Sequence, residues 1–369
     1  MKQKKILAVI GTRPEAIKMA PVILALKSEP WAEVRVLATA QHRQMLDQVN
    51  QFFGIEPDID LDIMRPNQAL TTLTARLLLD LDDVLQSEKP DAVLVQGDTT
   101  TVMTVALACF YHRIPIGHVE AGLRTWDMQN PFPEEANRVI AGKLARWHFA
   151  PTEGSRQNLL KEGIADADIV VTGNTVIDAL LMSAAKDLEL PIDIEADKRL
   201  VLVTSHRREN FGEPFRNICK ALRTLAKNNS DIQFLYPVHP NPNVKDVAHE
   251  FLAELPNVIL CEPLDYAPFI AVMKRAYLIL TDSGGVQEEA PALGKPVLVL
   301  RDETERPEAV EQGVVKLVGS NCERIIEEAQ RLLDDESAYK VMARGVSPYG
   351  DGHASERIVQ ILREYFDAI

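Results

Sequence analysis

The 369-residue sequence predicts an α/β protein made of two Rossmann-like domains that face each other across a cleft. Short apolar runs of strand type alternate with helical patterns along almost the whole chain, which is typical of parallel sheets joined by right-handed crossovers. The same rhythm restarts after residues 188–197, an acidic stretch that contains Pro191 and has the composition of a linker or a surface crossing. The two halves are not similar in sequence, so the repeat is architectural only.

The first half supplies the elements of the first predicted domain. Strands are expected over residues 5–10, 33–39, 92–96, 115–119 and 147–150. Helices are expected over residues 15–27, 44–53, 67–86 and 133–144, with another running from the turn at 97–101 to about residue 111. Open parallel sheets bind ligands beyond the carboxyl ends of their strands, so a site is sought in the loops that follow these strands.

The second half contains the most informative single stretch, residues 277–300. It predicts a strand over 277–281, a turn at 282–285, a helix over 286–293 and a strand over 297–300. Further strands are expected over 200–204, 233–238, 258–261 and 314–318. A helix that begins at Ser283, Gly284 and Gly285 directs unpaired N–H groups at the space above the turn, where small residues let a phosphate approach. A plain strand-to-helix turn is the alternative interpretation, since most Gly-Gly pairs serve only that purpose.

Composition limits the classes of function. The net charge of −14, from 40 Lys and Arg against 54 Asp and Glu, argues against broad binding to nucleic acids or membrane surfaces. An anionic small ligand would need basic residues gathered locally. The four cysteines are scattered and predict reduced core residues, with no metal site. The apolar run at residues 6–10 is too short for a signal peptide, and no stretch approaches a membrane span, so a cytoplasmic protein is expected.

Charged side chains follow several predicted strands of both halves. Asp98, Glu120 and Glu134 are three separate carboxylates suited to acid–base chemistry, and nearby Arg and His residues are suited to phosphates. Two plainer interpretations stay open. Asp98 would serve as an N-cap, in competition with Thr99 or Thr100, and Glu134 would only place negative charge at a helix start.

The absence of two motifs narrows the choice of cofactor. No GxGxxG follows a predicted strand, which argues against a bound NAD or FAD. No GxxxxGK[ST] occurs, which excludes ATP hydrolysis of the P-loop kind. We therefore expect no cofactor, and a nucleotide would be held by a glycine-turn helix and a few basic side chains.

Taken together, motifs along nearly the whole chain resemble those of the bacterial non-hydrolysing UDP-N-acetylglucosamine 2-epimerases. They are GTRPE at 11–15, QH at 41–42, QGDT at 96–99, HVEAGLR at 118–124, PEEANR at 133–138, HRREN at 206–210, HPNP at 239–242 and DSGGVQEE at 282–289. The resemblance implies a fold like that of GT-B glycosyltransferases, with domains at 1–170 plus 356–369 and at 171–355. The C-terminal helix, at 355–366, would cross back onto the first domain. It also implies a homodimer that interconverts UDP-GlcNAc and UDP-ManNAc for cell-envelope polysaccharides.

The resemblance assigns roles to particular residues. Asp98 and Glu134 would handle the proton at C2 of the sugar with Glu120 assisting, although the sequence does not say which face each carboxylate serves. His206, Arg13 and Lys18 would meet the leaving phosphate and the sugar. The remaining substrate contacts would be Ser283, Gly284 and Gly285 at the diphosphate, Glu289 at the ribose, Phe269 and Leu264 at the uracil, and Arg306 at the phosphate or sugar.

A second UDP-GlcNAc activates some members of this family. The matching residues here are Gln41, Gln44, Arg65, Arg207 and His239, with Glu134 shared between the two sites. A surface Arg pair and structural histidines are the plainer alternatives at some of these positions. Other functions also remain open: a GT-B glycosyltransferase, a hydrolysing epimerase that releases UDP and ManNAc, or a non-catalytic sensor of nucleotide sugars.

Overall fold

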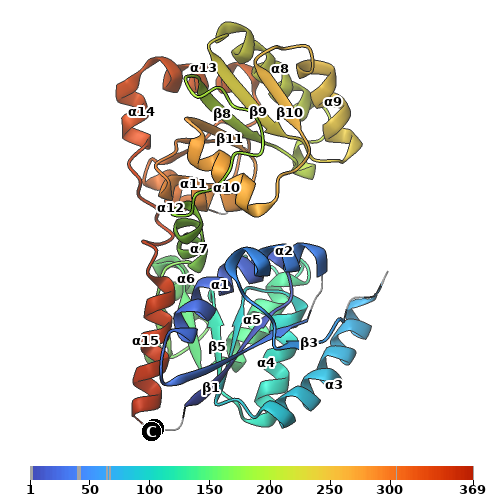
Figure 1. The fold of residues 1–369 in the computed structure, drawn as a ribbon, viewed down its shortest axis with the longest axis vertical. Coiled ribbons are helices and arrows are strands. Elements are labelled where there is room, and N and C mark those ends of the chain that lie inside the picture. Colours follow the sequence, from blue (N-terminus) through green and yellow to red (C-terminus); the bar gives the residue numbers. More distant parts are fainter. Residues whose placement is uncertain (1–2, 40–42, 64, 66–67, 305, 369) are drawn as a thin grey trace. The chain divides into compact units, whose positions relative to one another are not determined.

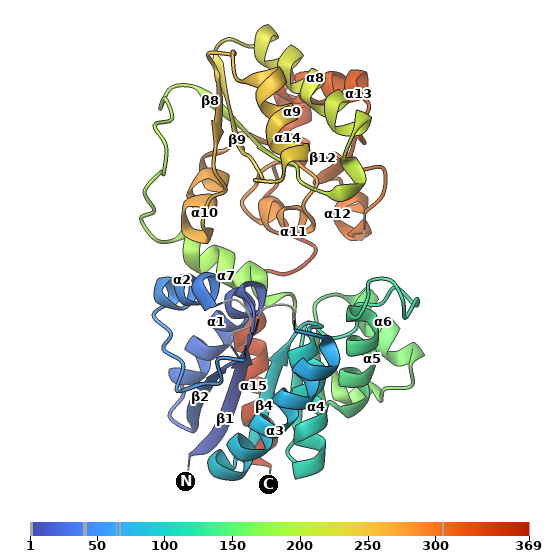
Figure 2. The same cartoon turned by 90° about the vertical axis from the view of Figure 1, so that its right-hand side faces the viewer.

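The computed structural model describes residues 3–39, 43–63, 65, 68–304 and 306–368. The chain divides into two compact units, each of which is described by itself (Figures 1 and 2). Unit 1 comprises Met1–Ala179 and Tyr349–Ile369, and unit 2 comprises Leu180–Pro348. The chain therefore first passes from unit 1 to unit 2 after residue 179, whereas the boundary expected from the sequence was residue 170.

Unit 1 is built on a fully parallel sheet with the strand order β3-β2-β1-β4-β5-β6-β7. The strands are β1 (Lys4–Ile10), β2 (Ala32–Ala38), β3 (Ile59–Asp60), β4 (Ala92–Gln96), β5 (Ile116–Val119), β6 (Trp147–Ala150) and β7 (Ile169–Val171). Ile6 to Ile10 of the interior strand β1 are all buried. This is the pattern expected of a parallel strand covered on both faces. The two edge strands, β3 and β7, were not predicted from the sequence.

Helices cover both faces of this sheet. They are α1 (Arg13–Lys27), α2 (Arg43–Phe53), α3 (Leu70–Glu88), α4 (Thr100–His112), α5 (Glu134–Leu144), α6 (Glu153–Lys161) and α15 (Ala354–Asp367). A further helix, α7 (Thr175–Ala184), begins in unit 1 and continues past the boundary at Ala179 into unit 2. In one layer α4 packs between α3 and α5, and in another α1 packs against α2 and α15 (Figure 1). The start of α15 is fixed by the buried carboxylate of Asp178, which accepts hydrogen bonds from the N–H of Ser355 at 2.7 Å and its hydroxyl at 2.6 Å.

Unit 2 repeats the architecture with the strand order β10-β9-β8-β11-β12-β13, again fully parallel. The strands are β8 (Arg199–Thr204), β9 (Ile232–Pro237), β10 (Val258–Cys261), β11 (Leu278–Thr281), β12 (Val297–Val299) and β13 (Val315–Leu317). The helices are α8 (Glu213–Asn228), α9 (Pro242–Leu252), α10 (Tyr266–Arg275), α11 (Gly284–Ala292), α12 (Pro307–Glu311), α13 (Cys322–Asp334) and α14 (Glu336–Met342). Two parallel α/β sheets were predicted, and that prediction is confirmed.

The core of unit 2 lies largely between its sheet and the layer of α8, α9 and α13. Phe215, Phe234 and Tyr236 are its largest buried side chains. Residues 188–197, expected to be a linker or a surface crossing, contain no helix or strand. Within the described ranges, no helix is both long enough and apolar enough to cross a membrane.

Candidate active site

Three adjacent strands of unit 1 bring predicted site residues to one edge of the sheet. Strand β4 lies between β1 and β5, so the loops that follow these three strands are neighbours. Lys18 lies on the first helix after β1, Asp98 in the loop after β4, and Glu120 directly after β5. Parallel strands expose their carboxyl ends at the same edge, which is where such sheets bind ligands.

The carboxylate of Glu120 is buried and held by several donors. The ammonium of Lys18 lies 2.6 Å from both of its oxygens. The side-chain amide of Gln96 donates to Oε2, and that of Asn174 donates to Oε1 at 3.1 Å. Glu120 also has a positive φ of 63°, a left-handed conformation that is uncommon for a residue with a side chain and clusters at functional sites. The backbone and the side chain of Glu120 are thus both fixed in one orientation.

Asp98 forms an ion pair with an arginine that the sequence interpretation did not select. Arg138 Nη2 lies 2.7 Å from Asp98 Oδ2, and Nε donates to the same oxygen at 2.9 Å. Arg138 Nη1 also donates to the buried Glu135 at 3.1 Å. Asp98 is not the N-cap of α4, because the hydroxyl of Thr99 accepts the hydrogen bond from the N–H of Val102. The alternative of Asp98 as a cap is therefore wrong.

Glu134 and Glu135 are neighbours in sequence with different surroundings. Glu135 is buried and accepts hydrogen bonds from the N–H groups of Thr125 and Trp126 at 3.1 and 3.0 Å. Glu134, the first residue of α5, is half-buried and has no hydrogen-bond or ion-pair partner among the described residues. Arg13, also half-buried, likewise has none within the described ranges. Among the residues that the structure describes, the charges of Glu134 and Arg13 thus have no internal hydrogen-bond or ion-pair partner.

Two further buried residues of unit 1 shape the same loops and were missed as site residues. The carboxylate of Glu15 accepts from the N–H groups of Gly11 and Thr12, both at 2.7 Å, and from the hydroxyl of Thr99 at 2.6 Å. Burial raises the pKa of Glu15, while these hydrogen bonds act to lower it. Glu15 thereby ties the loop after β1 to the loop after β4. The pattern T-x-x-E at 12–15, a capping box, was a signal for it.

His118 supports the loop that carries Asp98. Burial lowers the pKa of His118 to about 4, so the imidazole is neutral at pH 7. Its Nε2 lies 2.7 Å from the carbonyl oxygen of Gly97, which accepts only, and Nε2 therefore carries the proton and donates it. A structural role for His118 fits this contact at Nε2, while its Nδ1 is buried without a hydrogen-bond partner among the described residues.

In unit 2, His206 follows β8 at the carboxyl edge of the second sheet. Its backbone N–H donates to the buried carboxylate of Asp282 at 2.9 Å, and its ring stacks on that of His239 with centroids 5.8 Å apart. Partial burial lowers the pKa of His206, although the nearby Asp282 carboxylate acts in the opposite direction. His206 and His239 lie at the ends of the neighbouring strands β8 and β9.

The glycine turn of unit 2 has the geometry predicted for a strand followed by a helix. Ser283 is the N-cap residue of α11, in extended conformation, and its N–H donates to the Thr281 hydroxyl at 2.9 Å. A Cβ at Gly284 would lie 3.1 Å from the guanidinium carbon of Arg306, whereas a Cβ at Gly285 would have no atom within 4 Å. The space beside Gly285 is therefore open. Arg306 is also half-buried and donates to Glu288 at 2.7 Å.

The other predicted residues are placed as follows. Leu264, Phe269 and Glu289 are half-buried in unit 2, where Phe269 lies on α10 and Glu289 on α11. Arg207 and His239 lie in unit 2, and Arg65 is exposed in unit 1, where it donates to the carbonyl oxygen of Asp62 at 3.2 Å. Gln41 lies outside the described residues, as does the side chain of Gln44.

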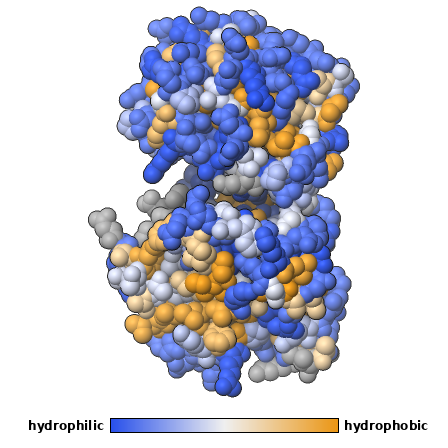
Figure 3. All heavy atoms as spheres, turned by 180° about the vertical axis from the view of Figure 1, so that it is seen from behind, coloured by the Kyte–Doolittle hydropathy of each residue, from blue (hydrophilic) through white to orange (hydrophobic). Residues whose placement is uncertain are grey.

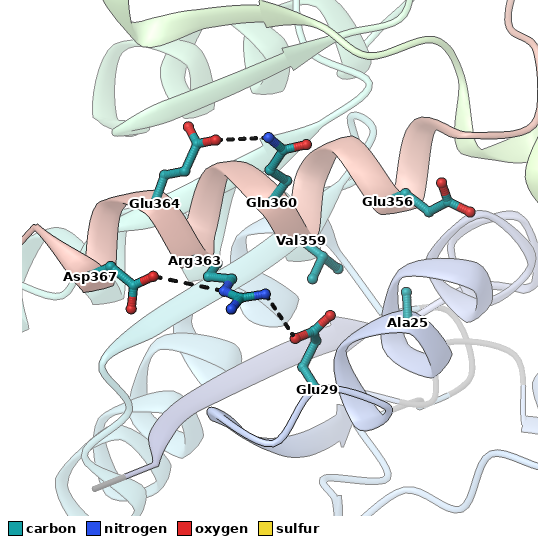
Figure 4. A pocket seen from close by; sticks show the side chains of 8 residues that line it. All are labelled: Ala25, Glu29, Glu356, Val359, Gln360, Arg363, Glu364 and Asp367. Carbon is teal, nitrogen blue, oxygen red and sulfur yellow. Dashed lines mark hydrogen bonds and ion pairs between the residues drawn. The ribbon is translucent and has the colours of Figure 1, made fainter. Parts of the chain in front are cut away.

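A cavity of about 430 Å³ between α1 and α15 is separate from these loops (Figure 4). Half of its eight lining residues are acidic, and Arg363 lies within 4.0 Å of Glu29. Ala25 lies in the last turn of α1 and Glu29 in the turn that follows the helix, at the amino edge of the sheet and hence opposite to the strand-end loops. Among the described residues, no group of three His, Cys, Asp or Glu side chains is placed to hold a metal ion.

Comparison with known proteins identifies the family. The family model described as UDP-N-acetylglucosamine 2-epimerase matches residues 24–363. The chain belongs to this epimerase family. It is 57% identical to the UDP-N-acetylglucosamine 2-epimerase of Escherichia coli (strain K12), with 97% of this chain and 98% of that protein covered. The crystal structure of the Neisseria meningitidis epimerase bound to UDP-GlcNAc matches with a TM-score of 0.86 and 50% identity, covering 98% of this chain and 100% of that one.

A more distant likeness concerns the fold alone. The structure of the glycotransferase of kitacinnamycin matches with a TM-score of 0.66 at 12% identity and covers 99% of each chain. The predicted membership of the bacterial UDP-N-acetylglucosamine 2-epimerases, the class as an isomerase and the GT-B-like fold are thereby confirmed. The roles of single residues are not decided by these comparisons.

Proposed function

We propose that the chain catalyses the reversible epimerisation of UDP-GlcNAc to UDP-ManNAc at C2, without net hydrolysis, and supplies cell-envelope polysaccharide synthesis. The observation that carries the proposal is the cluster of strand-end loops in unit 1, where Asp98 and Glu120 are held by cationic partners and Glu134 is not. Family membership supplies the substrate class.

The proposed reaction needs no oxidant and no cofactor. The proton at C2 of the sugar is not acidic, because no carbonyl group is conjugated with that carbon. When the bond from C1 to the UDP oxygen breaks, its electron pair leaves with UDP and positive charge develops at C1. A base then removes the C2 proton, the C–H electrons form the C1–C2 double bond, and a 2-acetamidoglucal results. Re-addition of UDP, with a proton delivered to the opposite face of C2, gives the epimer.

The surroundings of the three carboxylates favour different roles in this scheme. Glu120 is clamped by Lys18, Gln96 and Asn174, so it is suited to orienting the sugar and stabilising positive charge rather than to moving a proton. Glu134 has no internal partner among the described residues and is free to exchange a proton with substrate. Both described contacts of Asp98 with Arg138 use Oδ2, so its other carboxylate oxygen takes no part in them. We therefore assign proton transfer at C2 to Asp98 and Glu134.

Unit 2 is proposed to bind the UDP moiety. The backbone of Ser283, Gly284 and Gly285 at the start of α11 offers N–H groups to the diphosphate, and the open space at Gly285 admits it. Arg306 supplies positive charge, together with Arg13 and Lys18 of unit 1, and His206 adds to it in its protonated form. By family resemblance, Glu289 would accept hydrogen bonds from the ribose hydroxyls, and Phe269 and Leu264 would contact the uracil.

The proposal is tested by proton NMR of UDP-GlcNAc incubated with the purified protein in D₂O, with no added cofactor. Deuterium at C2 and a growing UDP-ManNAc signal are expected. Accumulation of free UDP with ManNAc would instead indicate a hydrolysing epimerase. An unchanged spectrum would reject epimerisation and favour a glycosyltransferase or a sensor. Glu134→Gln should lose C2 exchange by at least about 100-fold, the usual effect of removing a general acid or base.

We also propose a homodimer formed through α3 and α4. Apolar atoms gather on the face of unit 1 where these helices lie (Figure 3), and Leu79, Phe110 and Tyr111 are 71%, 58% and 68% exposed there. The ion pair between His112 and Asp82, 2.7 Å long, places these parts of the two helices side by side. Exposed apolar patches on soluble proteins mark interaction surfaces. Light scattering should give a dimer mass, and Tyr111→Glu should give a monomer; a wild-type monomer would reject the proposal.

A second UDP-GlcNAc is proposed as an activator, bound by Gln41, Gln44, Arg65, Arg207 and His239 with Glu134 shared. The exposed positions of Arg65 and His239 are compatible with ligand access. Initial rates should rise sigmoidally with UDP-GlcNAc, and traces of UDP-GlcNAc should accelerate the reverse reaction. Hyperbolic kinetics without such activation would reject this regulation and leave the catalytic proposal intact.

A further inference from the structure

The carboxylate of Asp282, directly after β11, is completely buried and bound to a single short segment. Its donors all come from residues 205–210. They are the Ser205 hydroxyl at 2.9 Å, the His206 N–H at 2.9 Å, the Arg207 N–H at 2.9 Å and the Asn210 side-chain amide at 3.0 Å. No Lys or Arg side chain forms an ion pair with Asp282 within the described residues.

A buried carboxylate is costly unless hydrogen bonds replace its lost hydration. Here neutral donors do so, and hydrogen bonds to a charged acceptor are stronger than ordinary ones. These hydrogen bonds can replace the lost hydration of Asp282 only if the segment 205–210 keeps its observed conformation, since two of the donors are consecutive backbone N–H groups. Asp282 and this segment therefore fix each other.

The same contacts join the two loops that face the proposed diphosphate. Asp282 immediately precedes Ser283 and the glycine turn, while its partner segment carries His206. A second link lies one residue earlier on each strand, where the hydroxyls of Thr204 and Thr281 are 2.6 Å apart. The side chain of Tyr236 also donates to the carbonyl oxygen of Ser205 at 2.7 Å. The loop after β8 and the turn after β11 thus form one hydrogen-bonded body.

We propose that Asp282 is a positioning residue for epimerisation, which acts through His206 by holding it beside the Ser283–Gly285 turn at the diphosphate of the nucleotide sugar. The inference rests on the proposed function. Asp282 itself does not touch the substrate, because its carboxylate is buried beneath the loop.

The charge of Asp282 adds an electrostatic effect to this geometric one. His206 Nδ1 lies 3.6 Å from Asp282 Oδ1, and the other charged or titratable groups facing it are His239 and Arg207. Burial lowers the pKa of His206 most, His239 and Arg207 lower it further, and Asp282 raises it. Asp282 thereby favours the protonated imidazole, the form that stabilises a departing diphosphate.

A double-mutant cycle with Asp282→Asn and His206→Asn tests the proposal through kcat, KM and the affinity for UDP measured by calorimetry. Alone, Asp282→Asn should lower kcat and UDP affinity by at least tenfold and move the basic limb of the kcat profile to lower pH. In the His206→Asn background it should change either quantity by less than about threefold. Asp246→Asn, at an exposed site on α9, is the matched control and should change neither.

Additive effects, with the basic limb unmoved, would overturn the proposal and leave Asp282 a structural residue. If Asp282→Asn does not fold, Ser205→Ala replaces it in the double-mutant cycle, because this variant removes one hydrogen bond to Asp282 and keeps the carboxylate charge. The effects of Ser205→Ala and His206→Asn should then be non-additive in the same way. A wild-type protein that binds UDP without exchanging deuterium at C2 would reject the proposed reaction. The UDP-affinity cycle would still decide whether Asp282 acts through His206.

Discussion

The ion pair between Lys18 and Glu120 should be a major stabilising contact of unit 1. Lys18→Met keeps the apolar stem of the side chain and removes the ammonium, which leaves the Glu120 carboxylate with its amide donors Gln96 and Asn174. Removing one partner of a buried pair costs about 3–5 kcal/mol. The two side chains are 18% and 6% exposed, and the amide donors remain, so we expect the lower end of that range, about 3 kcal/mol.

Tryptophan fluorescence isolates the relevant transition. All three tryptophans, Trp31, Trp126 and Trp147, belong to unit 1, so fluorescence against urea follows this unit alone. For a unit of this size, a loss of about 3 kcal/mol lowers Tm by about 6–12 °C. Lys27→Met, at the exposed end of the same helix, is the control and should cost less than about 0.5 kcal/mol.

A double variant distinguishes an electrostatic effect of Lys18→Met from damaged packing. Glu120→Gln in the Lys18→Met background removes the buried negative charge that has lost the Lys18 ammonium and should recover most of the lost stability, although catalysis should stay low. If the double variant is no more stable than Lys18→Met, or if Lys18→Met behaves like the Lys27 control, then the pair does not contribute as reasoned here.

Three further outcomes follow from local contacts. Burial lowers the pKa of His118 from 6.5 to about 4, so the unfolded chain binds this proton first, and the free energy of unfolding of unit 1 should fall by about 2–3 kcal/mol between pH 7 and 4.5. Urea titrations of His118→Gln should lack that fall, and an equal fall in the variant would contradict the prediction. Gly285→Ala should leave Tm unchanged, since a Cβ there meets no protein atom, yet it should weaken UDP binding at least tenfold in calorimetry by occupying the space of the diphosphate. Unchanged UDP affinity would contradict the proposal that the diphosphate binds at this turn. Asp178→Ala should lower the free energy of unfolding by about 1–2 kcal/mol, because it removes the carboxylate that caps α15. Tyr365 of α15 packs on Trp147, so tryptophan fluorescence reports the change, and an unshifted unfolding transition would mean that packing alone holds the helix.

The sequence predicted most of the fold because its signals were periodic and local. Buried parallel strands appear as apolar runs, and Gly or Pro marks many of their ends. The edge strands β3 and β7, of two and three residues, escaped because so short a run has no recognisable pattern. They form through pairing with a neighbouring strand, which is a tertiary effect.

Residues of the candidate site could be selected from the sequence where a charged residue follows a strand, and could not be where a side chain faces inward. Glu134 and Glu135 look alike in sequence, but successive residues of a helix are rotated by about 100°, so one is half-buried beside the open edge and the other is buried. Arg138 and Asp282 were likewise not selected as site residues, because their roles depend on partners 40 and 72–77 residues away. Long-range pairing of this kind is decided by the fold.

The same contacts explain how a chain with a net charge of −14 is suited to an anionic ligand. Overall charge acts weakly through screened solvent, whereas a ligand responds to groups within a few ångströms. At the proposed diphosphate site these are backbone N–H groups of α11, which carry no counter-charge, and the Arg306 guanidinium, held over Gly284 by Glu288. A Cβ at residue 284 would lie 3.1 Å from the guanidinium carbon, so glycine gives the guanidinium room at its present position, and Gly285 leaves the adjoining space empty. The carboxylate of Glu288 accepts a hydrogen bond from Arg306 Nε at 2.7 Å, so this acidic residue fixes the position of a cation at the proposed site.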